Sequence, residues 1–212
     1  MKKPELLLII LAAVLFTAGR LCYYLAGHPE LFTTLSKIAM SAVIVCLSIY
    51  MYTHNKSQLN LFILIEMLVC CVGDILINFS FPVGILVFGI GHIIFIIGNL
   101  KVRPQKKLYQ LIILLAVAIA SAVVIIIIHE KIGWGLAAAV FVYIIIIMCA
   151  VVLALPRCKL LRFGYILFAV SDLLLIAKAT IFKGNVLAEV IALVVYYAAI
   201  IMIIHSMVNN KK

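Results

Sequence analysis

Eight apolar runs of about 20 residues, with few charges inside them, make up nearly the whole chain. They cover residues 5–26, 32–53, 59–79, 82–100, 108–128, 132–154, 160–182 and 186–208. A helix needs about 20 residues to cross the hydrocarbon core of a bilayer. The runs are continuous rather than alternating, which favours helices over a barrel. The sequence therefore predicts an all-α integral membrane protein with eight transmembrane helices.

The connectors between these runs are too short to form an extramembrane domain. We therefore expect residues 1–212 to form a single transmembrane domain. A net charge of +10 raises the alternative of nucleic-acid binding, but the basic residues lie mostly in the connectors. No basic face with interleaved aromatic residues exists, so nucleic acid is not an expected partner.

The Lys and Arg residues of the connectors indicate the orientation of the chain. Twelve of seventeen lie at the N-terminus, at the second, fourth and sixth connectors and at the C-terminus, while three lie on the other side. Positive charge accumulates on the cytoplasmic side of membrane proteins. Both termini are therefore expected to be cytoplasmic, and the first run to be an uncleaved span, in a bacterial cytoplasmic membrane.

Two similar six-residue segments place an acid inside an apolar run. Val-Gly-Asp-Ile-Leu-Ile ends at residue 77, and Val-Ser-Asp-Leu-Leu-Leu follows 98 positions later, so that the acids are Asp74 and Asp172. A charge at the centre of a bilayer costs about 2.5–3.5 kcal/mol on insertion scales, so such acids are functional candidates by default. The two segments lie in the third and seventh runs, an offset of four helices that is compatible with a weak 4+4 repeat.

Other polar residues lie at depths from which they reach the same place. Arg20, Lys37 and His92 are expected to share one outward-opening cavity with the two acids. Asn78, four residues after Asp74, lies on roughly the same helical face and is expected to orient its carboxylate. Glu66 is rotated by about 80° from Asp74, at 100° per residue. Whether Glu66 faces the same interior stays open.

Simpler interpretations of these residues exist. Arg20 or Lys37 neutralising Asp74, with Lys178 near Asp172, would be buried ion pairs without chemistry. A metal site is not expected, because the predicted topology keeps the five histidines apart and the six cysteines show no CxxC spacing. Ser171 has no neighbouring His in the sequence, which argues against a Ser-His-Asp triad.

Several motifs together resemble the YhhN/TMEM86 family of membrane proteins, which includes the lysoplasmalogenases. The resemblance covers most of the chain. It rests on Gly73-Asp74, on Phe88 to Phe95 with His92, on Tyr143 and Met148, on Phe168 to Leu175 with Asp172, and on Tyr196-Tyr197-Ala198-Ala199. The eight-helix architecture of that family agrees with the eight apolar runs.

The resemblance implies hydrolysis of the vinyl-ether bond of a lysoplasmalogen, giving a fatty aldehyde and a glycerophospho-alcohol without a cofactor. It also implies that Asp74 and Asp172 are the catalytic pair. Acid hydrolysis of a vinyl ether begins with proton transfer to carbon and passes through an oxocarbenium ion, for which two carboxyl groups are suited. Burial favours a neutral carboxyl group and a nearby cation favours a charged one. Asp172, deeper and without a close predicted cation, is therefore the expected acid.

A lysophospholipid and membrane lipids are the expected partners, and the oligomeric state stays open. Candidate substrate-binding residues are Arg20, Lys37, Asn78, His92, Ser171, Tyr196 and Tyr197. Arg20 and Lys37 are expected either to hold the substrate phosphate or to pair with Asp74. The two tyrosines either line the tunnel for the hydrocarbon chain or anchor the helix at the interface. A lipid or small-solute transporter and a non-enzymatic scaffold are the alternative functions.

Overall fold

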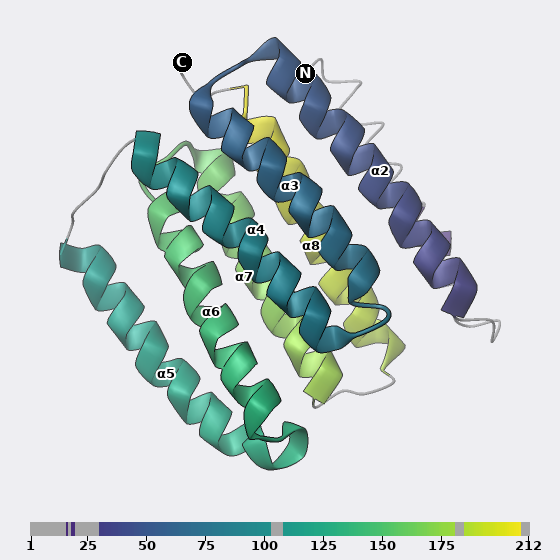
Figure 1. The fold of residues 1–212 in the computed structure, drawn as a ribbon, viewed down its shortest axis with the longest axis vertical. Helices are drawn as coiled ribbons and strands as arrows, with labels where there is room; N and C mark the ends of the chain where they lie inside the picture. Colours follow the sequence, from purple (N-terminus) through teal and green to yellow (C-terminus); the bar gives the residue numbers. More distant parts are fainter. Residues whose placement is uncertain (1–15, 17, 20–29, 103–107, 181–184, 209–212) are drawn as a thin grey trace.

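The computed structural model describes residues 16, 18–19, 30–102, 108–180 and 185–208. These residues form seven helices and no strand. Figure 1 shows the seven helices as a bundle in which successive helices run in opposite directions. Their bounds are α2 Glu30–His54, α3 Gln58–Leu76, α4 Phe81–Val102, α5 Leu108–Ile132, α6 Trp134–Ala154, α7 Lys159–Thr180 and α8 Val186–Ser206.

The helices agree with the predicted apolar runs at most of their ends. Six of them, α2, α3, α4, α6, α7 and α8, contain stretches long and apolar enough to cross a membrane. In α5 the corresponding described stretch is the shorter Gln110–Val123. The described part of the chain is thus that of a helical membrane protein. The first predicted run, residues 5–26, lies almost wholly outside the described residues.

The turn between α5 and α6 differs from its prediction. α5 ends at Ile132, beyond the predicted end at residue 128, and Gly133 alone joins it to α6. Gly133 has a φ of 79°, a conformation that glycine adopts without the steric penalty of a side chain. A single residue can therefore reverse the chain here.

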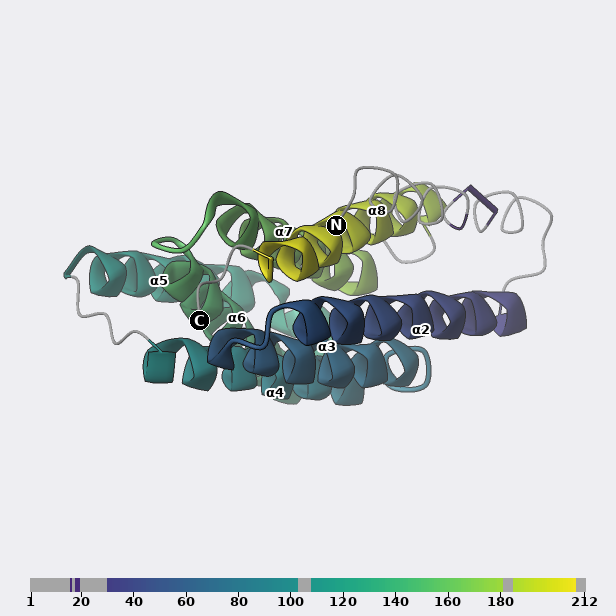
Figure 2. The same cartoon turned by 90° about the horizontal axis from the view of Figure 1, so that it is seen from above.

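Helix packing brings segments that are distant in sequence to one place. α3 packs against α2 and α4, α7 packs against α6 and α8, and α5 packs against α6. Contacts of α4 with α6 and of α2 with α8 join the two parts of the bundle. Figure 2 shows α2, α3 and α4 on one side and α7 and α8 on the other. The interior between α3, α4, α7 and α8 contains the polar residues described below.

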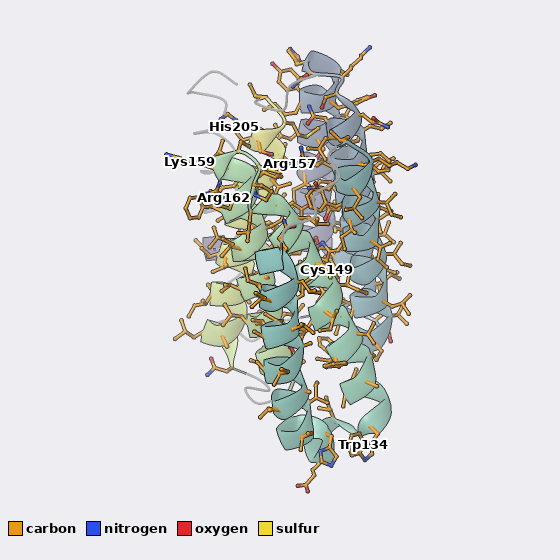
Figure 3. The ribbon with its side chains drawn as sticks, turned by 90° about the vertical axis from the view of Figure 1, so that its left-hand side faces the viewer. Trp134, Cys149, Arg157, Lys159, Arg162 and His205 are labelled. Atoms are coloured by element: carbon orange, nitrogen blue, oxygen red, sulfur yellow. The ribbon has the colours of Figure 1, made fainter. Side chains whose placement is uncertain are left out.

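Several basic residues lie together at one end of the bundle. Figure 3 shows Arg157, Lys159, Arg162 and His205 at this end and Trp134 at the opposite end. The side-chain amides of Asn55 and Asn60 both donate to the backbone carbonyl of Met207, at 2.7 and 2.8 Å, which ties the α2–α3 connector to the end of α8. The grouping of basic residues agrees with the expected charge asymmetry, while the side of the membrane on which they lie stays a prediction.

Gly164 allows the close approach of α7 and α8. A Cβ added there would lie 2.6 Å from Ile203 Cγ1 and 3.1 Å from the Ile203 backbone nitrogen. We expect Gly164→Ala to lower the free energy of unfolding by about 1–3 kcal/mol, as overpacking does. Gly135→Ala is the control, since a Cβ there meets nothing within 4 Å. Thermal unfolding of both variants in detergent measures the difference, and equal midpoints would contradict this packing.

Candidate active site

The two aspartates of the chain line the same cavity. Asp74 lies near the end of α3 and Asp172 in the middle of α7, and they are 8% and 4% exposed. The cavity has a volume of about 50 Å³, and its lining includes Lys37, Ser171 and Tyr196. That volume has room for water, because one water molecule needs roughly 10–15 Å³ of such space. Two carboxyl groups in separate helices therefore face one small, hydratable space.

Asp74 is held by a tyrosine of α8. The Tyr196 hydroxyl donates to Asp74 Oδ2 at 2.6 Å, and both side chains are buried. Asn78 does not orient the carboxylate as predicted, because its amide donates to the backbone carbonyl of Asp74 at 3.1 Å instead. Lys37 Nζ donates to Asn78 Oδ1 at 2.7 Å, so these two residues join α2 to the end of α3 beside Asp74.

Asp172 is held by a tyrosine of α6 and lies beside an imidazole of α4. The Tyr143 hydroxyl donates to Asp172 Oδ2 at 2.5 Å. His92 Nε2 lies 3.7 Å from the same oxygen, and the histidine is a cation only when protonated. Asp172 was expected to be the acid because no cation was predicted near it. This expectation is valid only when His92 is neutral. Ser171 lines the cavity, and its hydroxyl donates to the Phe168 carbonyl at 2.7 Å.

Behind Asp172, away from the cavity, lies a fully buried polar cluster. His92 Nδ1 lies 2.9 Å from Glu66 Oε1, and Tyr165 donates to the other oxygen of Glu66. Glu66 and His92 are 0% exposed, and neither is among the residues that line the cavity. His92 thus does not line the cavity that it was expected to share with the two acids, and its contact with a substrate stays a prediction. The open question about Glu66 is answered, since it faces the same interior as Asp172.

A model of the YhhN family matches residues 32–207. The chain belongs to the YhhN family. The match covers the seven described helices except the first two residues of α2, and it includes both aspartates and the cluster behind Asp172. No curated protein and no solved structure was found to match the chain.

In this YhhN protein the cation near the end of α7, Lys178, does not pair with Asp172. Lys178 forms an ion pair with Glu189 of α8, and both residues line the cavity. The alternative of a buried ion pair between Lys178 and Asp172 is therefore not supported, since six residues correspond to 600° and turn Lys178 to another face of α7. Glu189 was not among the predicted site residues. Arg20, the other predicted cation, lies outside the described residues.

The two adjacent tyrosines of α8 have different places. Tyr196 lines the cavity and contacts Asp74, whereas the ring of Tyr197 lies 5.9 Å from that of Phe16 and 5.4 Å from that of Tyr196. Both are at least nine-tenths buried, so neither is exposed in the manner of an interfacial anchor. The described residues contain no group of three or more His, Cys, Asp or Glu side chains arranged to hold a metal ion.

Proposed function

We propose that this YhhN protein is an intramembrane hydrolase of the lysoplasmalogenase type. It cleaves the vinyl-ether bond of a lysoplasmalogen-like lysophospholipid to a fatty aldehyde and a glycerophospho-alcohol. The observation that carries the proposal is the shared cavity, in which Asp74 and Asp172 each accept a hydrogen bond from a buried tyrosine. Family membership supports the same activity.

The reaction follows from a neutral carboxylic acid and a carboxylate on one small cavity. Asp172 gives its proton to the vinyl carbon that bears no oxygen, and the neighbouring carbon becomes an oxocarbenium ion. Water bonds to this carbon while Asp74 takes its proton. The bond between the hemiacetal carbon and the glycerol oxygen then breaks, and the glycerol oxygen receives the proton from Asp74. The hydroxyl group of the hemiacetal gives its proton to Asp172 and becomes the carbonyl oxygen of the aldehyde. One water is consumed and both acids return to their starting forms, a use of paired carboxyl groups like that in glycosidases.

The more exposed part of the lining carries the charges that a phospholipid head group needs. Lys37 and Lys178 are partly exposed, whereas the two acids are buried. A cationic donor at this position is suited to a phosphate oxygen. In the proposed mechanism Lys37 holds the substrate phosphate, so that the ether bond next to it reaches the aspartates. With the proposed cytoplasmic termini, the cavity opens toward the outer leaflet.

Solvent deuterium provides a direct test of this chemistry. The purified protein in detergent with EDTA is expected to release a long-chain aldehyde from a lysoplasmalogen. In deuterated water, the aldehyde should carry one deuterium on the carbon next to the carbonyl group, because that carbon receives the proton of an exchangeable carboxylic acid. Mass spectrometry of early time points, with the authentic aldehyde incubated in parallel, separates this deuterium from later exchange.

The matched substrate control is a lysophospholipid with a saturated ether in place of the vinyl ether. It has no carbon that an acid can protonate in this way, so no aldehyde should appear. Absence of aldehyde from the vinyl-ether substrate would contradict the proposed function. Aldehyde that forms early without deuterium would retain the activity but contradict the proton transfer to carbon.

A transporter is the second candidate function. The observation in its favour is that the helix contacts of the two halves of the chain correspond to each other. The contacts of α3 with α2 and α4 have counterparts in those of α7 with α6 and α8, and the cross-contacts α4–α6 and α2–α8 correspond as well. This is the pattern expected of two related halves with a binding site between them. Flux of a lysolipid across vesicles, without product formation, would favour transport over hydrolysis.

A further inference from the structure

Glu66 is an acidic side chain at the centre of the bundle for which the reaction described above has no use. It is 0% exposed and lies on α3, two turns before Asp74. Acids in membrane segments are rare and pair with other groups when they occur. The partners of Glu66 therefore indicate why the chain has an acid at this depth.

The contacts of Glu66 lead step by step to Asp172. Tyr165 of α7 donates to one carboxyl oxygen of Glu66, and the other oxygen lies 2.9 Å from His92 Nδ1 on α4. The second ring nitrogen of His92 lies 3.7 Å from Asp172 Oδ2 and 3.5 Å from the Tyr143 hydroxyl. Of these five side chains, only that of Asp172 lines the cavity. Tyr143 in turn donates to Asp172 Oδ2 at 2.5 Å, so four helices contribute to one line of polar groups in which Tyr143 links His92 to Asp172.

The arrangement fixes which nitrogen of the imidazole faces the site. A carboxylate at Nδ1 holds a proton on that nitrogen and fixes the ring plane, so the other nitrogen points in a set direction. Here that direction is toward Asp172 and Tyr143. The Phe168 ring lies edge-on to the His92 ring, with centroids 4.8 Å apart, which further restricts its rotation.

We propose that Glu66 is a positioning residue that acts through His92 to hold the Asp172 carboxyl group in place for the reaction. The proposal rests on the proposed function, in which Asp172 gives and regains a proton. A carboxyl group that must reach a carbon atom tolerates little misplacement, since a shift of about 1 Å can lower a rate by roughly 100-fold. Because Glu66 and His92 do not line the cavity, they influence turnover rather than substrate binding.

A cycle of variants separates this role from a purely structural one. Glu66→Gln keeps the shape of the side chain and removes its charge, and His92→Gln removes the ring through which it acts. We expect Glu66→Gln to lower kcat about tenfold while KM changes less than twofold. In the His92→Gln background, Glu66→Gln should have little further effect, because residues that act as a unit are not additive. Thermal unfolding of all four proteins identifies variants that do not fold.

Equal losses of kcat from Glu66→Gln in both backgrounds, or a change confined to KM, would overturn the proposal. So would unchanged turnover in Glu66→Gln. Glu130→Gln, on the exposed outer end of α5, is the matched control and should leave both constants unchanged.

Nuclear magnetic resonance of ¹⁵N-histidine-labelled protein tests the geometry without a substrate. His92→Gln assigns the signal. We expect a slowly exchanging proton on Nδ1 that is lost or shifted in Glu66→Gln, and an Nε2 signal that shifts in Asp172→Asn. If the wild-type protein releases no aldehyde, the proposed function fails and these signals alone decide whether Glu66 fixes the ring. Ring signals that are identical in Glu66→Gln and in the wild-type protein would overturn the positioning role.

Discussion

Asp172→Asn is expected to lower aldehyde release about 100- to 10,000-fold. General acid catalysis by a positioned side chain contributes a factor of that size, and an amide cannot supply the proton that the vinyl carbon takes up. The substitution keeps the size of the side chain, and the Asn oxygen can still accept from the Tyr143 hydroxyl, which donates to Asp172 Oδ2 at 2.5 Å. The fold should therefore persist. Turnover at saturating lysoplasmalogen, measured beside thermal unfolding in the same detergent, tests the expectation.

Asp74→Asn is expected to have an effect of the same order, because the amide cannot take the proton of the attacking water. The control is again Glu130→Gln, which removes an exposed acid outside the cavity. Activity within threefold of the wild-type value in either aspartate variant would end the catalytic interpretation of that residue. Loss of the folded state in both variants, with no active preparation, would instead favour a scaffold in which the acids only join helices.

The sequence was sufficient to predict the seven helices that the structure describes and a cavity shared by the two acids. A continuous run of about 20 apolar residues forms a helix in lipid, because a helix pairs all of its backbone polar groups within the segment. The similar segments around Asp74 and Asp172 indicated that two helices each present an acid to the interior, and both acids line one cavity.

The partners of the acids depend on packing and were mostly missed. Tyr143 and Tyr165 lie in apolar runs, where a tyrosine is typical of ordinary core. A helical-wheel signal for Tyr165 was present, since it precedes Asp172 by seven residues and so shares its face of α7. Tyr143 was singled out only by the family resemblance and Glu189 by nothing, because their contacts cross between helices whose register the sequence does not specify. Asn78 shows the opposite error, in which the correct helical face was predicted but the backbone carbonyl was the actual acceptor.

The two tyrosines make it possible to test which aspartate is charged. Tyr196 donates to Asp74 at 2.6 Å and Tyr143 to Asp172 at 2.5 Å, so the two hydrogen bonds are nearly alike in length. Their strengths should differ if the proposed roles are right. A hydrogen bond to a charged group contributes about 1.5–3 kcal/mol and one between neutral groups about 0.5–1.5 kcal/mol.

Tyr196→Phe is therefore expected to lower the free energy of unfolding by about 1.5–3 kcal/mol, and Tyr143→Phe only by about 0.5–1.5 kcal/mol. Tyr50→Phe, on an exposed side chain of α2, is the control for loss of a hydroxyl and should leave the stability, measured by unfolding in the same detergent, unchanged. The reverse order, with Tyr143→Phe the more harmful, would mean that Asp172 is the carboxylate and Asp74 the acid. Because both substitutions remove only a hydroxyl from a buried ring, the ratio of the two effects reports the charge on each aspartate rather than a difference in packing.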